Sequence, residues 1–171
     1  MSLSQPRIVD DLLNYRLSCL LAASGAMITR LCEGRYGITR REWRVIALLA
    51  AHGAMSPSEL AQRAQLERAR VSRLVTGLAG KGLLARIGDT EDKRRATVRL
   101  TAAGQALYDE LLPRSIQFNR EVLSALDPEE LRSFESALDK LTAQATRIAA
   151  LKPVPEKADR RHGGARRVRS A

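Results

Sequence analysis

The chain has 171 residues, 44% of them hydrophobic and 4% aromatic, and a net charge of +10, which allows one domain with extensions and indicates a polyanionic partner. It has no run of about 18 apolar residues, no signal-peptide pattern, and no metal-binding spacing among its two cysteines and two histidines. We therefore expect a cytoplasmic protein without a cofactor, a metal site or a membrane contact.

The first predicted element is a long apolar helix. Residues 1–7 are expected to be disordered, and a helical pattern then covers residues 8–33 with almost no charge between Leu17 and Thr29. A helix this apolar needs a partner, and we expect a second subunit to cover it; burial wholly inside its own chain is the alternative. Cys19 lies in this helix and is interpreted as a buried structural cysteine with an inert thiol.

A capping box opens the second helix. The spacing of Thr39 and Glu42 lets each side chain accept a hydrogen bond from the other residue's backbone N–H. The helix is predicted over residues 40–51 and ends before Gly53. Its predicted apolar face consists of Trp43, Ile46, Ala47 and Ala50. The segment "AMS" that follows is expected to add a minor third strand to a later hairpin.

Residues 56–101 carry the functional prediction. Ser56, Pro57 and Glu59 form a start signal for a short helix, and a second helix is predicted over residues 67–81. One stripe of the second helix faces a core and consists of Val71, Leu74, Val75 and Leu78. The opposite face carries guanidinium and hydroxyl groups, as a helix in the DNA major groove requires. This exposed face consists of Arg68, Ala69, Arg70, Ser72, Arg73, Thr76 and Gly80.

A charged hairpin follows this helix pair. Residues 83–87 and 96–101 alternate as two antiparallel strands, and the turn between them exposes Lys93, Arg94 and Arg95, within reach of a phosphate or a minor groove. Two short helices followed by such a hairpin form a winged helix-turn-helix. This order of elements indicates a DNA-binding unit more specifically than any one of its parts.

Two helices and a basic tail complete the chain. A helical pattern begins after Thr101 and meets Pro113, which predicts either a bend in one helix or two abutting helices. Asp127 is the predicted N-cap of the last helix, which is expected to end near Leu151. The tail, residues 152–171, is expected to be disordered; it either adds non-specific phosphate contacts or serves only for solubility.

This order of elements resembles the MarR family of bacterial transcription regulators over roughly residues 12–148. The similar segments are the recognition-helix region "LAQRAQLERARVSRLVTGLAGKGLLAR", the hairpin "DTEDKRRATVRLT" and the following "LTAAGQALYDELLP". The resemblance implies a homodimer with interlocked first and last helices, which places a recognition helix in the major groove and a wing in the minor groove of double-stranded DNA. Glu91 departs from the family's wing, where arginine is common, and this removes one basic contact expected at the wing tip.

The predicted fold class is therefore mainly α. A winged helix-turn-helix DNA-binding domain, residues 37–101, is flanked by long dimerisation helices, residues 8–36 and 102–151. The resemblance implies that Arg94 enters the minor groove with Asp92 as its orienting partner. It also places five residues of the second short helix at base edges and nearby phosphates: Arg68, Ala69, Arg70, Ser72 and Arg73. All predicted DNA-binding residues are Ser56, Ser58, Arg68, Ala69, Arg70, Ser72, Arg73, Thr76, Lys93, Arg94 and Arg95.

The predicted function is a sequence-specific regulator, expected to repress, that binds a palindromic operator as a dimer and is released by a small phenolic or anionic effector. The candidate effector site between the first two helices consists of Met27, Arg30, Trp43 and Arg44. Met27 and Trp43 also fit an ordinary core. The alternatives are a peroxide sensor acting through Cys19, which a branch of the family implies, a non-specific architectural DNA-binding protein, and a winged helix used for protein contacts. An enzyme is disfavoured, because "GLAGKG" lacks the Ser or Thr that follows the lysine of a phosphate loop.

Overall fold

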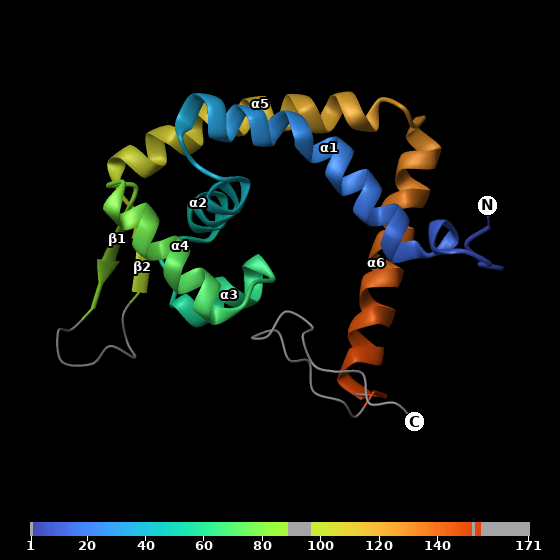
Figure 1. Cartoon of the computed structure of the whole chain (residues 1–171). Coiled ribbons are helices and arrows are strands. Elements are labelled where there is room, and N and C mark those ends of the chain that lie inside the picture. The colour runs from blue at the N-terminus through green and yellow to red at the C-terminus, as the bar shows by residue number, and fades with distance from the viewer. Residues whose placement is uncertain (1, 89–96, 152, 155–171) are drawn as a thin grey trace. The chain divides into compact units, whose positions relative to one another are not determined.

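The computed structural model describes residues 2–88, 97–151, 153 and 154 (Figure 1). The predictions for the wing turn and the basic tail, including those for Lys93, Arg94 and Arg95, lie outside the described residues. By its internal contacts the chain divides into two compact units, residues 1–124 and 125–171. The fold is mainly α, with one antiparallel hairpin, as predicted. The elements in chain order are η1 (Val9–Asp11), α1 (Leu13–Tyr36), α2 (Arg40–His52), α3 (Pro57–Ala64), α4 (Arg68–Gly80), β1 (Leu84–Ile87), β2 (Thr97–Leu100), α5 (Ala102–Leu123) and α6 (Pro128–Leu151).

Helix α1 begins later and ends later than predicted. A short 3-10 turn, η1, precedes it, and Asp11 accepts a hydrogen bond from the backbone N–H of Arg7 (3.0 Å). The extended backbone of Leu12 separates this turn from α1, so the helix does not start at residue 8. At the other end Gly37 takes a left-handed conformation (φ 60°), which favours glycine and stops the helix after Tyr36.

The centre of the first unit is α2, which contacts α1, α3, α4, α5 and β2. Figure 1 shows α1 and α5 on one side of α2 and α3 and α4 on the other. The predicted apolar face of α2 was too narrow. Val45 and Leu49 are also buried, whereas Ala47 and Ala50 are only half-buried. An amphipathic pattern marks a single buried face, but α2 is covered from several sides and therefore needs a wider one.

Local start signals are confirmed at three helices. In both predicted capping boxes the glutamate carboxylate accepts from the N-cap backbone N–H, Glu42 from Thr39 (2.6 Å) and Glu59 from Ser56 (2.8 Å). Asp127 caps the last helix by accepting from two backbone N–H groups of its first turn. These caps satisfy N–H groups that a helix start otherwise leaves without partners, so they form wherever the residues have the right spacing.

The hairpin and the helix that follows it also agree with the predicted pattern. Strand β1 pairs antiparallel with β2, and the predicted minor third strand is a single bridge between Met55 and Val98. Of the two alternatives at Pro113, the structure shows one continuous helix, α5. Tyr36 and Arg35 both donate to Glu110 Oε1, at 2.7 and 2.8 Å, and so fasten the end of α1 to α5.

The second unit consists of α6 and the residues that follow it. None of the residues of α6, all of which the structure describes, is buried within the chain. Its apolar side chains include Leu141 and Ile148, which are 45% and 46% exposed. A helix with an exposed apolar stripe requires a partner surface to be stable in water.

Gly104 allows α5 to start close to the hairpin. Thr101, the N-cap of α5, donates its backbone N–H to the Leu83 carbonyl (3.1 Å), and Gly104 is buried against that same carbonyl. We predict that Gly104→Ala lowers the free energy of unfolding by about 1–3 kcal/mol, because the added methyl group collides with backbone that cannot move aside. Urea denaturation followed by circular dichroism measures the effect.

The control for this substitution is Gly34→Ala. Gly34 lies in α1 with open space around the position of its missing Cβ. The alanine variant should be as stable as the wild type or more stable by about 0.5–1 kcal/mol. If the Gly104→Ala and Gly34→Ala proteins are equally stable, the contact between Gly104 and the Leu83 carbonyl does not require glycine.

Candidate nucleic-acid interface

Helices α3 and α4 are joined by a tight turn that sets their relative direction. Gln65 adopts a left-handed conformation (φ 54°), and its side chain donates to the Gln62 carbonyl (2.9 Å). Leu66 donates its N–H back to Ala61 (3.0 Å). The buried Ala61 and Ala64 leave room for α4 to pack closely on α3. The two helices and their turn therefore form a helix-turn-helix.

The two faces of α4 differ as predicted. Val71, Val75 and Leu78 are buried, and Leu74 is half-buried. The residues predicted for the outer face are all exposed: Arg68, Ala69, Arg70, Ser72, Arg73, Thr76 and Gly80. No acidic residue occurs anywhere in α4. A packed inner stripe thus holds an outer face that carries guanidinium and hydroxyl groups, which are donors suited to base edges and phosphates.

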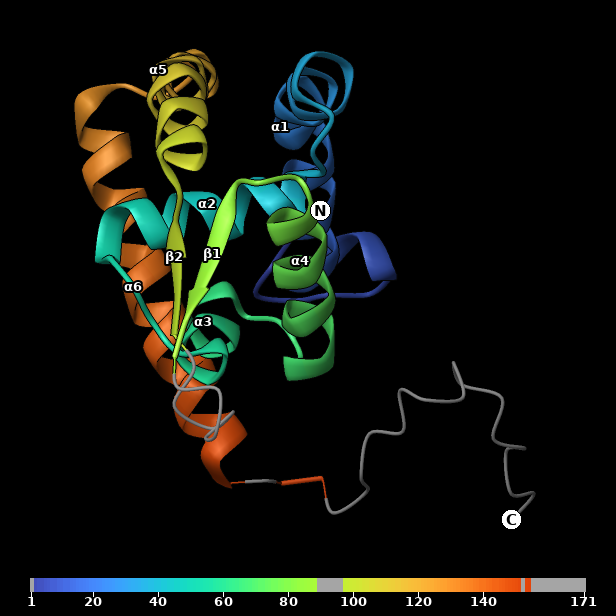
Figure 2. The same ribbon diagram turned by 90° about the vertical axis from the view of Figure 1, so that its left-hand side faces the viewer.

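Arg86 joins this surface from the hairpin, and the sequence analysis did not identify it. Its guanidinium donates to Thr76 Oγ1 (2.8 Å), and Thr76 Oγ1 donates to the Ser72 carbonyl (3.0 Å). Arg86 pairs across the hairpin with the buried Val98, so both lie on the sheet face turned toward the core. The alternation of β1 counted from the buried Leu84 would have shown this orientation. Figure 2 shows β1 lying next to α4.

The other predicted DNA-binding residues have different positions. Ser58 is exposed at the start of α3. Ser56 is half-buried, and its hydroxyl oxygen accepts from the backbone N–H of Glu59 (3.2 Å), so it stabilises the helix start. The structure brings the α3 and α4 candidates together on one unit, and their contacts with DNA stay predictions.

An ion pair between the exposed Lys81 and the buried Glu42 holds the C-terminal end of α4. Lys81 Nζ donates to Glu42 Oε1 and to the Gly37 carbonyl, both at 2.8 Å. Glu42 is buried and also caps α2 through Thr39. Burial opposes ionisation of this carboxyl, but the hydrogen bonds from Lys81 and Thr39 outweigh it and hold the pKa of Glu42 below its ordinary value. The pair connects α4 to the corner between α1 and α2.

A cavity of about 490 Å³ lies between α1, α2 and α5. Trp43, whose ring stacks on Tyr108 with 5.8 Å between centroids, lines it with Arg44. Met27 and Arg30, the other two candidate effector residues, do not line it. Gly25 and Ile28 of α1 line the cavity. Met27 and Arg30 each follow one of these residues by two positions, or roughly 200° around the helix, so they lie on the other side of α1. Further lining residues that the sequence analysis did not identify include Arg40, Phe118 and Asn119.

The comparison with known proteins agrees with this architecture. A model of the MarR family matches residues 36–95. The transcriptional repressor MdtR of Bacillus subtilis (strain 168) is 30% identical over 111 residues, which are 65% of this chain and 72% of MdtR. The chain belongs to the MarR family.

Other relatives extend the likeness. FarR, a transcriptional regulator of Neisseria gonorrhoeae, is 34% identical over 94 residues, which are 54% of this chain and 64% of FarR. The chain thus spans less than two thirds of FarR. A MarR/EmrR family regulator from Acinetobacter sp. ADP1 has a similar structure, with a TM-score of 0.74, 25% identity, and coverage of 82% of this chain and 99% of that one. NadR in complex with 4-hydroxyphenylacetate gives a TM-score of 0.65 at 26% identity, with 80% and 96% coverage.

The two cysteines of this MarR-family chain differ in environment. Cys19 is exposed within its own chain, so its expected burial would need the second subunit that is proposed to cover α1. The pKa of Tyr15 is raised, mainly because its side chain shares a hydrogen bond with the side chain of Cys19. Cys32 is buried, and this burial raises the pKa of its thiol to about 11. A redox role of Cys19 stays a prediction.

Two further observations apply to the described residues alone. No helix among them is long and apolar enough to cross a membrane. No group of three histidine, cysteine, aspartate or glutamate side chains in the same part of the chain has the arrangement of metal ligands.

We predict that Lys81→Met lowers the free energy of unfolding at pH 7 by about 1–3 kcal/mol, because it leaves Glu42 buried without its charged donor. The pKa of Glu42 is lowered in the folded state, so its contribution is complete above the unfolded-state value near 4.5 and is lost as the pH falls through the folded-state value. The variant should therefore lose less stability than the wild type between pH 7 and pH 4. Urea denaturation at both pH values provides the measurement.

Lys140→Met is the matched control, since Lys140 is exposed on α6 and its substitution removes the same charge. This control should be as stable as the wild type at both pH values. Equal stability of the two variants would contradict a structural role for the ion pair.

Proposed function

We propose that this MarR-family chain is a sequence-specific, DNA-binding transcription regulator that represses by occupying its operator. The observation that carries the proposal is the outer face of α4. Arg68, Arg70 and Arg73 are exposed there on a helix with no acidic residue, while the inner stripe fastens that helix to the core. The names of MdtR, a transcriptional repressor, and FarR, a transcriptional regulator, support the same function. We propose no catalytic activity for this chain.

The proposed DNA-binding surface extends beyond α4. Arg86 adds a charge beside Thr76, and Ser58 stands at the start of α3. We also assign to this surface the wing residues Lys93, Arg94 and Arg95, on the basis of the sequence pattern. Contacts from these side chains to DNA phosphates give affinity and fix the position of the protein along the duplex. Contacts from α4 to the edges of the bases give the preference for one DNA sequence.

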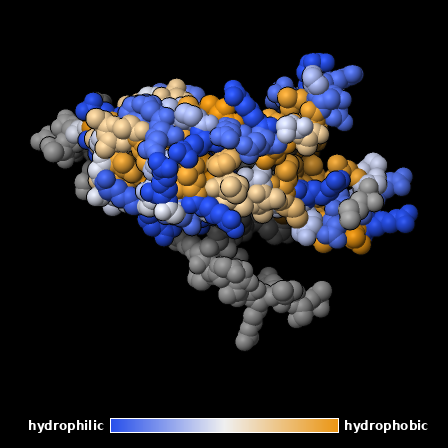
Figure 3. All heavy atoms as spheres, turned by 90° about the horizontal axis from the view of Figure 1, so that it is seen from above, coloured by the Kyte–Doolittle hydropathy of each residue, from blue (hydrophilic) through white to orange (hydrophobic). Residues whose placement is uncertain are grey.

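The proposed assembly is a homodimer. On α1 the side chains of Leu20, Leu21 and Met27 are 48%, 53% and 51% exposed. Figure 3 shows apolar residues on the surface that α1 and α5 form, seen from above. A second copy would cover this apolar area, and residues 8–36 and 102–151 are therefore proposed as the dimerisation region. Two-fold symmetry requires a palindromic operator with half-sites about one helical turn apart.

The proposed effector is a small phenolic or aromatic acid that binds in the cavity beside Trp43. Aromatic and apolar walls with a few polar groups are typical of ligand sites of this size. Trp43 and Phe118 supply the apolar walls, and Arg40 and Arg44 supply donors for a carboxylate. NadR, a structural relative, was crystallised with 4-hydroxyphenylacetate. Because the cavity borders α2, which contacts α4, its occupancy can change the position of the recognition helix.

We predict that Arg73→Ala weakens binding to the operator by about 1–3 kcal/mol, or roughly 5- to 150-fold, because a base-edge or phosphate contact is lost. Arg86→Ala should also weaken binding, because Thr76 loses its hydrogen-bond donor. Fluorescence anisotropy measures the affinity of each variant for two DNA duplexes at two salt concentrations. One duplex comes from the region upstream of the gene that encodes this chain, and the other has the same bases in scrambled order.

Arg99→Ala is the control for charge, since Arg99 is exposed on β2 on the sheet face opposite to Arg86. Arg99→Ala should reduce the affinity for the operator less than Arg73→Ala or Arg86→Ala does. If the Arg73→Ala protein binds the operator as tightly as the wild type does, the outer face of α4 is not the DNA-binding surface. Equal binding of both duplexes that disappears with salt would support an architectural DNA-binding protein instead.

For the effector site we predict that Phe118→Ala weakens binding of 4-hydroxyphenylacetate by about 1 kcal/mol or more, roughly fivefold, because the ring of the ligand loses an apolar wall. Isothermal titration calorimetry measures this affinity. Ile116→Ala is the control, since Ile116 is exposed on α5 and does not line the cavity. Equal affinities of the two variants would place the ligand elsewhere.

A further inference from the structure

The outermost line of α4 contains a single long side chain. At about 100° per residue, four residues lie within roughly 30° of the direction opposite the buried stripe, and they are Ala69, Arg73, Thr76 and Gly80. We propose that Arg73 reads one guanine in each half of the operator, whereas the neighbouring arginines bind DNA phosphates. This assignment depends on the proposed function, because it requires α4 to bind DNA.

The guanidinium of Arg73 is available to a base. Arg73 is exposed, and none of the described residues accepts a hydrogen bond from it. A guanidinium presents its N–H donors in a rigid planar fork. In the major groove guanine presents two acceptors, O6 and N7, side by side, and no other base presents two acceptors there. The donor geometry of Arg73 therefore favours guanine over the other three bases.

The short residues around Arg73 allow α4 to approach the bases closely. Ala69 lies one turn before Arg73 and carries only a methyl group. Gly80 lies at the other end of the line. Among the described residues, no other element has an atom within 4 Å of the place where a Cβ of Gly80 would be. Packing within the chain therefore does not require glycine there, and its small size keeps the surface of the helix open to DNA.

Thr76 cannot donate a hydrogen bond to a base, because its only hydrogen is already used. Its hydroxyl donates to the Ser72 carbonyl (3.0 Å) and accepts from the guanidinium of Arg86 (2.8 Å). A hydroxyl group has one hydrogen to donate. Thr76 therefore holds Arg86 in place, and Arg73 remains as the residue of the outermost line whose side chain can donate to a base edge.

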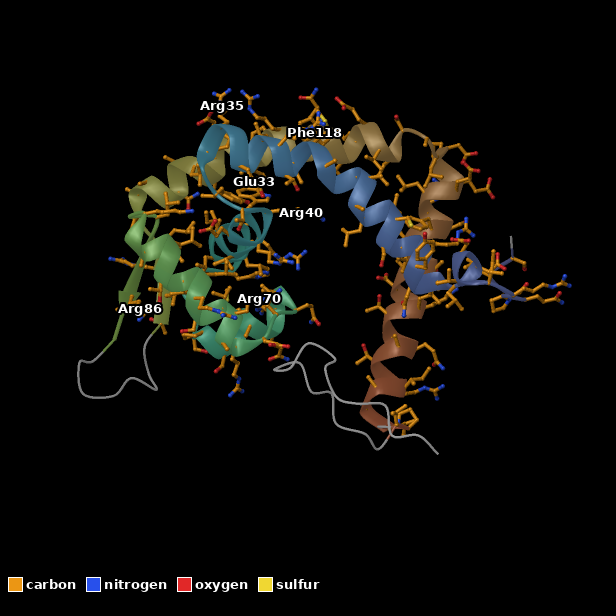
Figure 4. All side chains as sticks on the ribbon, viewed as in Figure 1. Glu33, Arg35, Arg40, Arg70, Arg86 and Phe118 are labelled. Atoms are coloured by element: carbon orange, nitrogen blue, oxygen red, sulfur yellow. The ribbon has the colours of Figure 1, made fainter. Side chains whose placement is uncertain are left out.

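The other arginines lie to the sides of this line. Arg68 and Arg70 point roughly 90–110° away from it, in opposite directions around the helix. Figure 4 shows Arg70 near the start of α4 and Arg86 on β1, whose guanidinium reaches the second half of α4. An α-helix fills the major groove, and a phosphate backbone borders each side of that groove. Cations beside the outermost line therefore face phosphates, and such contacts carry no direct sequence information.

The base is tested with duplexes that the full-length protein selects from a random pool. The selected duplexes should share a G·C pair at the same place in each half-site. Replacing this pair by A·T in both half-sites should weaken wild-type binding, measured by fluorescence anisotropy, by about tenfold or more. Replacing the guanine by 7-deazaguanine, which lacks the N7 acceptor, should weaken binding by about threefold or more, because one of the two hydrogen bonds is lost.

Two variants test whether Arg73 is the reader. Arg73→Ala should bind the G·C, A·T and 7-deazaguanine duplexes with affinities equal within about twofold, because the side chain that distinguishes them is absent. Arg70→Ala is the matched control, since it removes the same charge from the same helix. This control should bind all three duplexes more weakly by a similar factor and keep the preference for guanine. It should also lower the salt dependence of the affinity by about one counterion per subunit.

Both substituted positions are exposed, so both variants should stay folded, and circular dichroism checks this. If Arg73→Ala keeps the preference for guanine, or Arg70→Ala loses it, the assignment is overturned and the proposed function stands. A selected duplex whose affinity depends on no guanine would also overturn the assignment alone. If the wild type prefers no duplex to a scrambled one, the proposed function itself fails, so the two failures are distinguishable.

Discussion

The structure depends on the burial of α2 from several sides at once. This helix contacts the apolar α1 and α5 as well as the α3–α4 pair and the hairpin. Val45 and Ile46 at its centre are fully buried. A helix packed in this way cannot shift without moving its neighbours, because protein interiors are close-packed. Any ligand that displaces α2 would therefore also displace the helix that carries the proposed DNA-binding residues.

Glu42 strengthens this dependence at one point. Its carboxylate caps the start of α2 and accepts from Lys81 at the end of α4. One buried side chain thus joins the first turn of the central helix to the last turn of the recognition helix. A buried charge of this kind is stable only while its partners stay in place, so it restricts the relative positions of the two helices.

The first half of α4 is rich in arginine. Arg68, Arg70 and Arg73 are all exposed on this helix. Exposed guanidinium groups are suited to bind phosphates and the edges of bases. Because screening by salt weakens such interactions, the proposed binding of DNA should weaken as the ionic strength rises.

The sequence by itself determined the features that depend on near neighbours in the chain. The capping pairs at Thr39 and Ser56, the two faces of α4 and the hairpin strands all follow from spacing within a few residues, where local hydrogen bonds and helical periodicity decide the outcome. The motifs that resemble the MarR family also lie within such local segments. They were sufficient to identify the fold class and the main candidate surface before any contact was known.

Only the tertiary structure decided which side chains meet across the fold. The contact of Arg86 with Thr76 and the pair of Lys81 with Glu42 join residues from different elements, and no local pattern specifies them. Cys19 was expected to be buried because apolar neighbours surround it in the sequence, yet its side of α1 has no cover within the chain. Met27 and Arg30 fall outside the cavity beside Trp43 for a related reason: the rotation of α1 about its axis is set by what packs against it. Whether a side chain is buried or lines a cavity depends on contacts with residues far away in the sequence, and the order of residues does not show these contacts.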